Sequence, residues 1–126
     1  MNISASRVFR LSITACCLSV TLLVAGCHSY RVDATVENRT GGTITELEVD
    51  YPSASFGANS LSADAVFHYR FQVRGSGPVT VQYTASDGRQ VKLTGPTLHE
   101  KQEGRLDVIL PPDGKAAFHV ELFPRD

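Results

Sequence analysis

The chain has 126 residues, of which 12 are lysine or arginine and 13 are aspartate or glutamate, so its formal net charge is −1 at pH 7. A nearly neutral chain without a basic run lacks the charge that binding to nucleic-acid phosphates requires. We also expect no metal or organic cofactor, because the sequence has neither closely spaced metal ligands nor a glycine-rich nucleotide loop between a strand and a helix.

An uncharged apolar segment lies near the start of the chain. Arg7 and Arg10 precede it, and the apolar run over 11–24 contains no charged residue. A positive region followed by roughly 7–15 apolar residues is typical of an export signal. A membrane-spanning helix needs about 20 apolar residues, which is more than this run provides before it ends.

The apolar run closes with Leu22-Leu23-Val24-Ala25-Gly26-Cys27. A small pair directly before a cysteine resembles the lipobox of bacterial lipoproteins. The resemblance implies that a signal helix, 1–26, is cleaved between Gly26 and Cys27, and that Cys27 carries a lipid that holds the protein to the membrane. The alternatives are an uncleaved anchor and an ordinary secretory signal with an incidental cysteine.

Cleavage would leave one mature domain, 27–126, with Cys27 as its single cysteine. If that cysteine is lipidated, no thiol remains for a disulfide, so an apolar core must stabilise the domain. His28 follows the cysteine where an aspartate would resemble the retention signal of enteric bacteria. By that resemblance we expect the protein in the cell envelope, on the outer membrane and facing the periplasm.

Apolar and polar residues alternate repeatedly through the mature segment, which is the pattern of half-buried strands. Such stretches occupy 30–36, 44–51, 67–73, 79–83, 91–93, 106–110 and 118–122. Turn residues separate them about every 8–12 residues, as in a β-sandwich. The pattern predicts an all-β fold, a small antiparallel sandwich of about seven strands, Ig-like or transthyretin-like in architecture. A small closed barrel fits the long connections less well.

Several irregularities interrupt this alternation. Ile44 is out of phase with the strand that follows it, which predicts a β-bulge near Thr45. Asp87-Gly88 predicts a tight type I′ hairpin turn. The segment 52–60, rich in Ser, Ala and Gly, is predicted to be the longest irregular loop, and 95–104 is predicted to be a second polar connection.

The polar side chains form no set that indicates catalysis. His68 and His119 occupy outward strand positions, where they are interpreted as solvent-facing residues and not as a metal pair. The acidic row Glu46, Glu48 and Asp50 is interpreted as the solvated face of a strand. No nucleophile can be paired with a base, so the chain is predicted not to be an enzyme.

Three functions from different classes are compatible with these patterns. The favoured one is a protein-interaction module that docks on an envelope protein through a strand edge or through the 52–60 loop, with Phe56 and Asn59 as contact residues. The second is a binding module for a small hydrophobic or peptide ligand, for which the aromatic face over 67–71 would line a cavity. The third is inhibition of a hydrolase, because Gly75-Ser76-Gly77 resembles the serine–glycine loop of periplasmic lysozyme inhibitors, whose cysteines this chain lacks.

The predicted tether is short. The first strand begins at about Tyr30, so the link from Cys27 spans on the order of 10 Å. A domain on such a link should lie close to the lipid headgroups, with the 39–42 turn at its far end.

Overall fold

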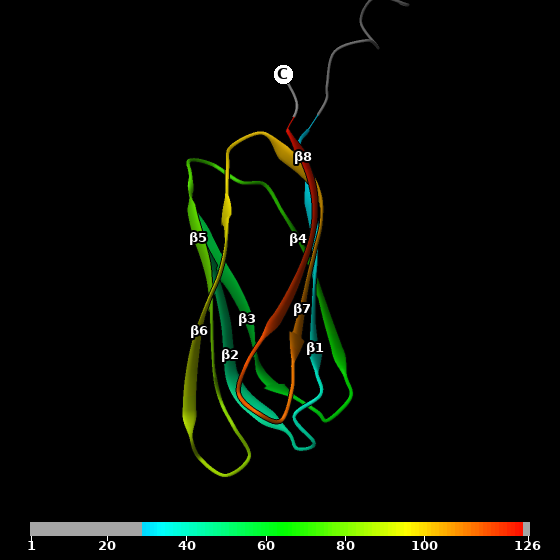
Figure 1. The fold of residues 1–126 in the computed structure, drawn as a ribbon, viewed down its shortest axis with the longest axis vertical. Coiled ribbons are helices and arrows are strands. Elements are labelled where there is room, and N and C mark those ends of the chain that lie inside the picture. Colours follow the sequence, from blue (N-terminus) through cyan, green and yellow to red (C-terminus); the bar gives the residue numbers. More distant parts are fainter. Residues whose placement is uncertain (1–28, 125–126) are drawn as a thin grey trace, which may run out of the picture.

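A computed structural model describes residues 29–124 (Figure 1). The predicted cleavage and lipidation residues, Gly26 and Cys27, lie outside the described residues. The described chain forms eight strands in two four-stranded sheets. They are β1 (Val32–Asn38), β2 (Ile44–Tyr51), β3 (Ala54–Leu61), β4 (Val66–Phe71), β5 (Gly77–Thr84), β6 (Gln90–Leu98), β7 (Gln102–Leu110) and β8 (Ala117–Pro124). Within residues 29–124, no helix has the length and apolar character needed to cross a bilayer.

The all-β sandwich prediction is confirmed. One sheet has the strand order β4-β1-β7-β8 and the other β3-β2-β5-β6. Paired strands are antiparallel except β1 and β7, which are parallel, so the prediction of a purely antiparallel sandwich is wrong at this pair. In immunoglobulin domains the first and second strands share a sheet, whereas here they lie in different sheets. This strand order therefore differs from that of the Ig-like alternative.

The prediction of a loop over 52–60 is wrong. After a turn at Pro52 and Ser53, β3 runs back along β2 in a continuous antiparallel pairing from Tyr51 to Ile44. Small residues such as Ala, Ser, Gly and Asn have weak strand preference, but hydrogen bonding to a preformed neighbour can hold them extended. This strand is the one that the predicted count of seven lacks.

The second polar connection is also shorter than predicted. β6 continues to Leu98 and β7 begins at Gln102, so only a brief turn separates them instead of the whole of 95–104.

The core lies between the two sheets and follows the alternation of the strands. Residues with no more than 1% exposure come from both sheets and include Val32, Val36, Val49, Val79, Val81, Leu98, Leu106, Val108 and Leu110. Burying a valine or leucine side chain stabilises a fold by roughly 1.5–3 kcal/mol. Such a core supplies the stability that the domain cannot take from disulfides.

The predicted β-bulge near Thr45 is confirmed. The pairing of β2 with β5 shifts register between Thr45 and Glu48, and Glu46 has a positive φ of 54°. The extra residue lets both Ile44 and Leu47 point into the core, although they are three positions apart. It also places Glu46 on the outer surface of the sheet.

The hairpin between β5 and β6 forms at the predicted place but with a different turn. The Gly88 amide donates to the carbonyl of Ala85 (2.9 Å), and the Ala85 amide donates to the carbonyl of Arg89 (2.8 Å). Only Gly88 of the two central residues has positive φ, at 87°. The connection is therefore a three-residue loop ending in a left-handed glycine, and the two-residue type I′ prediction is wrong.

Both ends of the described chain lie at the same end of the sandwich, and the 39–42 turn lies at the opposite end (Figure 1). This arrangement follows from strands that alternate in direction along the long axis of the domain. β3 runs along this axis, so its edge faces sideways (Figure 1).

Candidate functional site

The candidate site lies on the side of the sandwich where β3 and β4 form the edges of their sheets. Edge strands expose unpaired main-chain groups, and charged residues or prolines usually protect them from pairing with other chains. β4 carries Arg70, β6 carries Lys92 and Pro96, and β8 carries Glu121. The eight residues of β3, Ala-Ser-Phe-Gly-Ala-Asn-Ser-Leu, include neither a charge nor a proline.

The opposite side of the sandwich is closed by a side chain. The ring of Phe118 on β8 lies so close to Gly95 on β6 that a Cβ at the glycine would come within 2.6 Å of it. This contact covers the gap between the two sheets on that side.

Stacked aromatic rings fill the gap between the sheets beside β3; we call this group, formed by Tyr51, Phe56, Phe67, Tyr69 and Phe71, the aromatic seam. The centroids of the Phe56 and Tyr69 rings are 4.4 Å apart, and those of Tyr51 and Phe71 are 4.1 Å apart. Burial raises the pKa of Tyr51 above its ordinary value, so its hydroxyl stays neutral at physiological pH. The seam occupies the space that a ligand between the sheets would need here.

Part of this side is open to solvent and apolar. Tyr69 is 40% exposed. Val66, on the same strand, is 42% exposed but is in phase with His68 and Arg70, so it belongs to the outer face of the other sheet. Phe56 is only 7% exposed, so the prediction that it projects from a loop is wrong. Its side chain points inward from β3 and stacks on Tyr69. Asn59 is exposed on β3, three residues after Phe56 and on the outer face of the sheet. An apolar surface thus adjoins the unprotected edge.

An acidic hollow lies on the outer face of the same edge, lined by Glu46, Leu47, Glu48, Ser55, Phe56, Gly57, Ala58 and Asn59. Gly57 pairs directly with Glu48 across β2 and β3. A Cβ at Gly57 would lie 1.9 Å from the carbonyl oxygen of Leu47, so a larger residue would push β3 away from β2. The Glu46 carboxylate accepts a hydrogen bond from the Thr84 hydroxyl (3.0 Å), whereas the carboxylate of Glu48 has no hydrogen bond or ion pair within residues 29–124.

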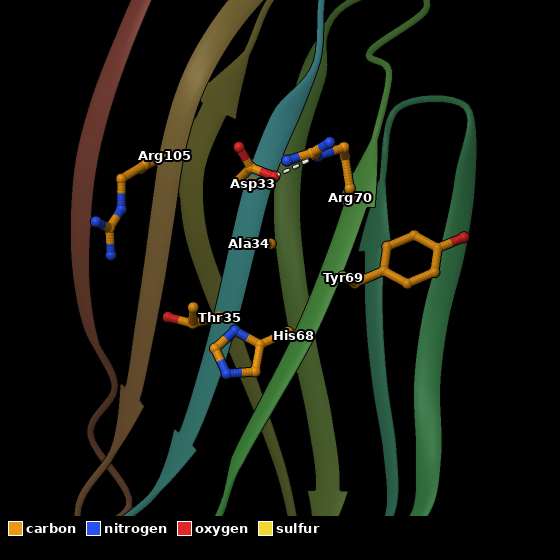
Figure 2. A pocket seen from close by; sticks show the side chains of 7 residues that line it. All are labelled: Asp33, Ala34, Thr35, His68, Tyr69, Arg70 and Arg105. Carbon is orange, nitrogen blue, oxygen red and sulfur yellow. Dashed lines mark hydrogen bonds and ion pairs between the residues drawn. The ribbon is translucent and has the colours of Figure 1, made fainter.

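A second hollow lies on the outer face of the other sheet, between β4 and β1 (Figure 2). Arg70 donates to Asp33 across the two strands, and the Thr35 hydroxyl donates to Asp107 at 2.7 Å. The Thr35 hydrogen bond is the main cause that lowers the pKa of Asp107, and Arg105 adds to it. The exposed ion pair of Arg70 and Asp33 contributes little binding or stability. The charges of this face are already matched, which makes it a weaker candidate.

Figure 2 also shows that Tyr69 points to the opposite side of β4 from His68 and Arg70, toward the strands of the other sheet. The alternation along β4 therefore divides its residues between the charged outer face and the aromatic seam.

The histidines do not meet. His68 and His119 lie in one row of the sheet, but on β4 and β8, its two edges, with Thr35 and Asp107 between them. Three strand spacings separate them by about 14 Å, which is too far to share a metal ion. Among residues 29–124, no group of three acidic, histidine or cysteine side chains is placed to hold a metal.

One contact between polar side chains was not predicted from the sequence. His99 Nδ1 lies 3.3 Å from the Ser76 hydroxyl, and both residues are exposed on turns at the end of the sandwich. Within the described chain no third side chain orients the histidine, as a catalytic triad would require. Ser76 belongs to the Gly75-Ser76-Gly77 segment, in which Gly75 turns the chain at a φ of 81° and Gly77 begins β5.

Comparisons with known proteins support the fold and leave the function open. No protein-family model matches the chain, and a search of curated proteins finds no match. Among solved structures, the chain resembles one described as the NMR structure of the protein from Eubacterium rectale, with a TM-score of 0.54 and 13% sequence identity. The match covers 75% of this chain and 94% of that one. At this identity the likeness concerns the sandwich fold alone.

Proposed function

We propose that this protein is a non-catalytic interaction module, held at the envelope membrane by a lipid on Cys27, that binds an extended segment of another envelope protein along β3. The observation that carries the proposal is the β3 edge, which has eight residues, no charge and no proline, and the partly exposed ring of Tyr69 beside it. An added strand would take its main-chain hydrogen bonds from β3 and bury its inward side chains on Tyr69.

The tether proposed from the lipobox is compatible with this mode of binding. Cys27 is two residues from Ser29, a reach of about 7 Å, so the end of the sandwich that contains Ser29 would lie near the headgroups. Because the β3 edge runs along the long axis of the domain, it stays accessible from the side (Figure 1). A partner could therefore be embedded in the same membrane or lie against it, and the outer membrane facing the periplasm is the location that we propose.

The test is affinity capture of the full-length, lipidated protein from envelopes after brief chemical crosslinking. The edge variant Ala58→Lys adds a charge at a half-buried inward position of β3, and Thr94→Lys adds a charge at an exposed position of the β6 edge, as a control for a charge on the other edge of the same sheet. We expect one envelope protein in near-stoichiometric yield with wild type and with Thr94→Lys. We expect its loss with Ala58→Lys, which circular dichroism and thermal melting should show to be folded.

A Cys27→Ser variant tests the role of the lipid in the same experiment. The captured protein should be lost or strongly reduced when the anchor is removed. Capture of the same partner by a folded Ala58→Lys variant would contradict binding along β3, and undiminished capture by Cys27→Ser would contradict the need for membrane placement.

A further inference from the structure

The first element of the inference is the row of residues that crosses the outer face of the β3 sheet. Gly57 pairs with Glu48, which pairs with Gln82. A strand added beside β3 would place one residue opposite Gly57 in this same row, on the same face of the sheet. Because Gly57 has no side chain, nothing in the row separates that residue from Glu48.

The distance suits a long basic side chain. Neighbouring strands lie about 4.8 Å apart, so the Cα of the added residue would lie about 10 Å from the Cα of Glu48. An extended lysine or arginine reaching across the glycine covers this distance together with the glutamate side chain.

The charges of the hollow favour such a residue. The carboxylate of Glu48 has no hydrogen bond or ion pair within the described chain, and that of Glu46, which accepts from Thr84, lines the same hollow. Glu46 holds a φ of 54°, a conformation that costs a non-glycine residue roughly 1–2 kcal/mol. Glu46 thus places a carboxylate in the hollow at a position where glycine would have less backbone strain.

The neighbouring positions of the added strand face the other way. Side chains alternate along a strand, so the residues before and after the basic one would point inward, beside Phe56 and Ala58. There they would lie over the exposed part of Tyr69 at the aromatic seam. Those positions require apolar side chains.

We propose that the segment bound by β3 has an apolar–basic–apolar pattern, with its lysine or arginine opposite Gly57 and within reach of Glu48 and Glu46. This inference rests on the proposed strand addition and specifies the chemistry of the partner. It predicts charge selectivity that simple edge pairing would not give.

The test uses the full-length lipidated protein in detergent micelles and three fluorescein-labelled peptides, TVTVRVTVT, TVTVQVTVT and TVTVEVTVT. Anisotropy should give the order arginine, glutamine, glutamate, with the arginine peptide bound roughly fivefold more tightly than the glutamine one, and with this preference reduced in 1 M salt. Glu48→Gln should remove the preference. Glu121→Gln, on the outer face of the other sheet, is the matched control and should keep it.

Equal binding of the arginine and glutamine peptides, or a preference that survives Glu48→Gln, would overturn the inference and leave strand addition intact. Failure of all three peptides to bind at millimolar concentration would overturn it as well. The capture experiment with Ala58→Lys decides strand addition independently, so the two failures can be told apart.

Discussion

Asn38 provides the sharpest test of how the end of the sandwich opposite Ser29 is held together. Its side chain is fully buried at the end of β1. Nδ2 donates to the carbonyls of Gly42 (2.8 Å), Leu61 (2.9 Å) and Ser62 (3.1 Å), and Oδ1 accepts from the amide and hydroxyl of Thr40. One amide therefore joins the turn after β1 to the end of β3, which lies in the other sheet.

Asn38→Ala should lower the free energy of unfolding by about 3 kcal/mol. The carbonyl of Leu61 is the fully buried acceptor, and leaving it without a donor costs about 1–3 kcal/mol. The hydrogen bonds at the part-buried partners contribute about 1 kcal/mol each, and water can replace part of that. Asn38→Asp should be worse at neutral pH, because it places a carboxylate against carbonyl oxygens, and it should recover as the carboxyl group is protonated.

The measurement is urea denaturation followed by circular dichroism, in the Cys27→Ser background so that no detergent is needed. Asn59→Ala, an exposed asparagine on β3, is the control and should change stability by less than about 0.5 kcal/mol. If Asn38→Ala costs no more than Asn59→Ala, the reasoning about this amide is refuted.

Three further predictions concern strain and titration. Glu46→Gly should raise the free energy of unfolding by about 0.5 kcal/mol in thermal melts, because relief of the left-handed backbone strain exceeds the conformational cost of glycine. The same variant should reduce the preference for the arginine peptide. A decrease in the free energy of unfolding above about 1 kcal/mol would contradict the argument. Gly104→Ala should cost more than about 2 kcal/mol in urea titrations, because φ is 138° and a Cβ would lie 2.0 Å from a carbonyl of β8. Gly114→Ala, with open space around it, should cost only about 1 kcal/mol, and equal losses would refute the steric argument. Thr35→Val should remove the hydrogen bond that lowers the pKa of Asp107. This hydrogen bond stabilises the fold at pH values above the unfolded pKa of Asp107, about 3.9. The stabilisation is lost as the pH falls through the lowered pKa of the folded state. The destabilisation caused by Thr35→Val should therefore be present at pH 7 and shrink as the pH falls below the unfolded pKa and Asp107 is protonated in the folded protein. A pH-independent difference in denaturation curves would contradict the assignment.

Strands whose alternation is strict could be predicted from sequence because their pattern is local. The inward positions of β5 are Val79, Val81 and Tyr83, and each is buried. The bulge at Thr45 could be predicted for the same reason, since one extra residue in a strand shifts the phase of its apolar positions by a single step.

β3 could not be predicted in this way because its inward residues are out of phase and small. Phe56 and Leu61 are five positions apart and both buried, with Ala58 half-buried between them. Their extended conformation depends on pairing with β2 and not on local preference. The parallel pairing of β1 with β7 is likewise non-local, because it joins Thr35 to Asp107.

The candidate site escaped sequence reasoning for a related reason. The sequence predicts Phe56 and Asn59 as contact residues, but it places them on a loop. Whether a strand is an edge depends on which strands pair, and no local pattern contains that information. A signal was present in the composition: of the four edge strands, β3 is the one without charge or proline.

The measurement that tests the central claim most directly is photo-crosslinking in intact envelopes from single positions of the lipidated protein. A photoreactive amino acid would replace Asn59 on β3, Tyr69 on β4, Lys92 on β6 or His119 on β8, one at a time. Docking along the β3 edge predicts one discrete adduct of the same mass from Asn59 and Tyr69, and none from Lys92 or His119. An adduct from His119 or Lys92, together with no adduct from Asn59, would contradict docking along the β3 edge.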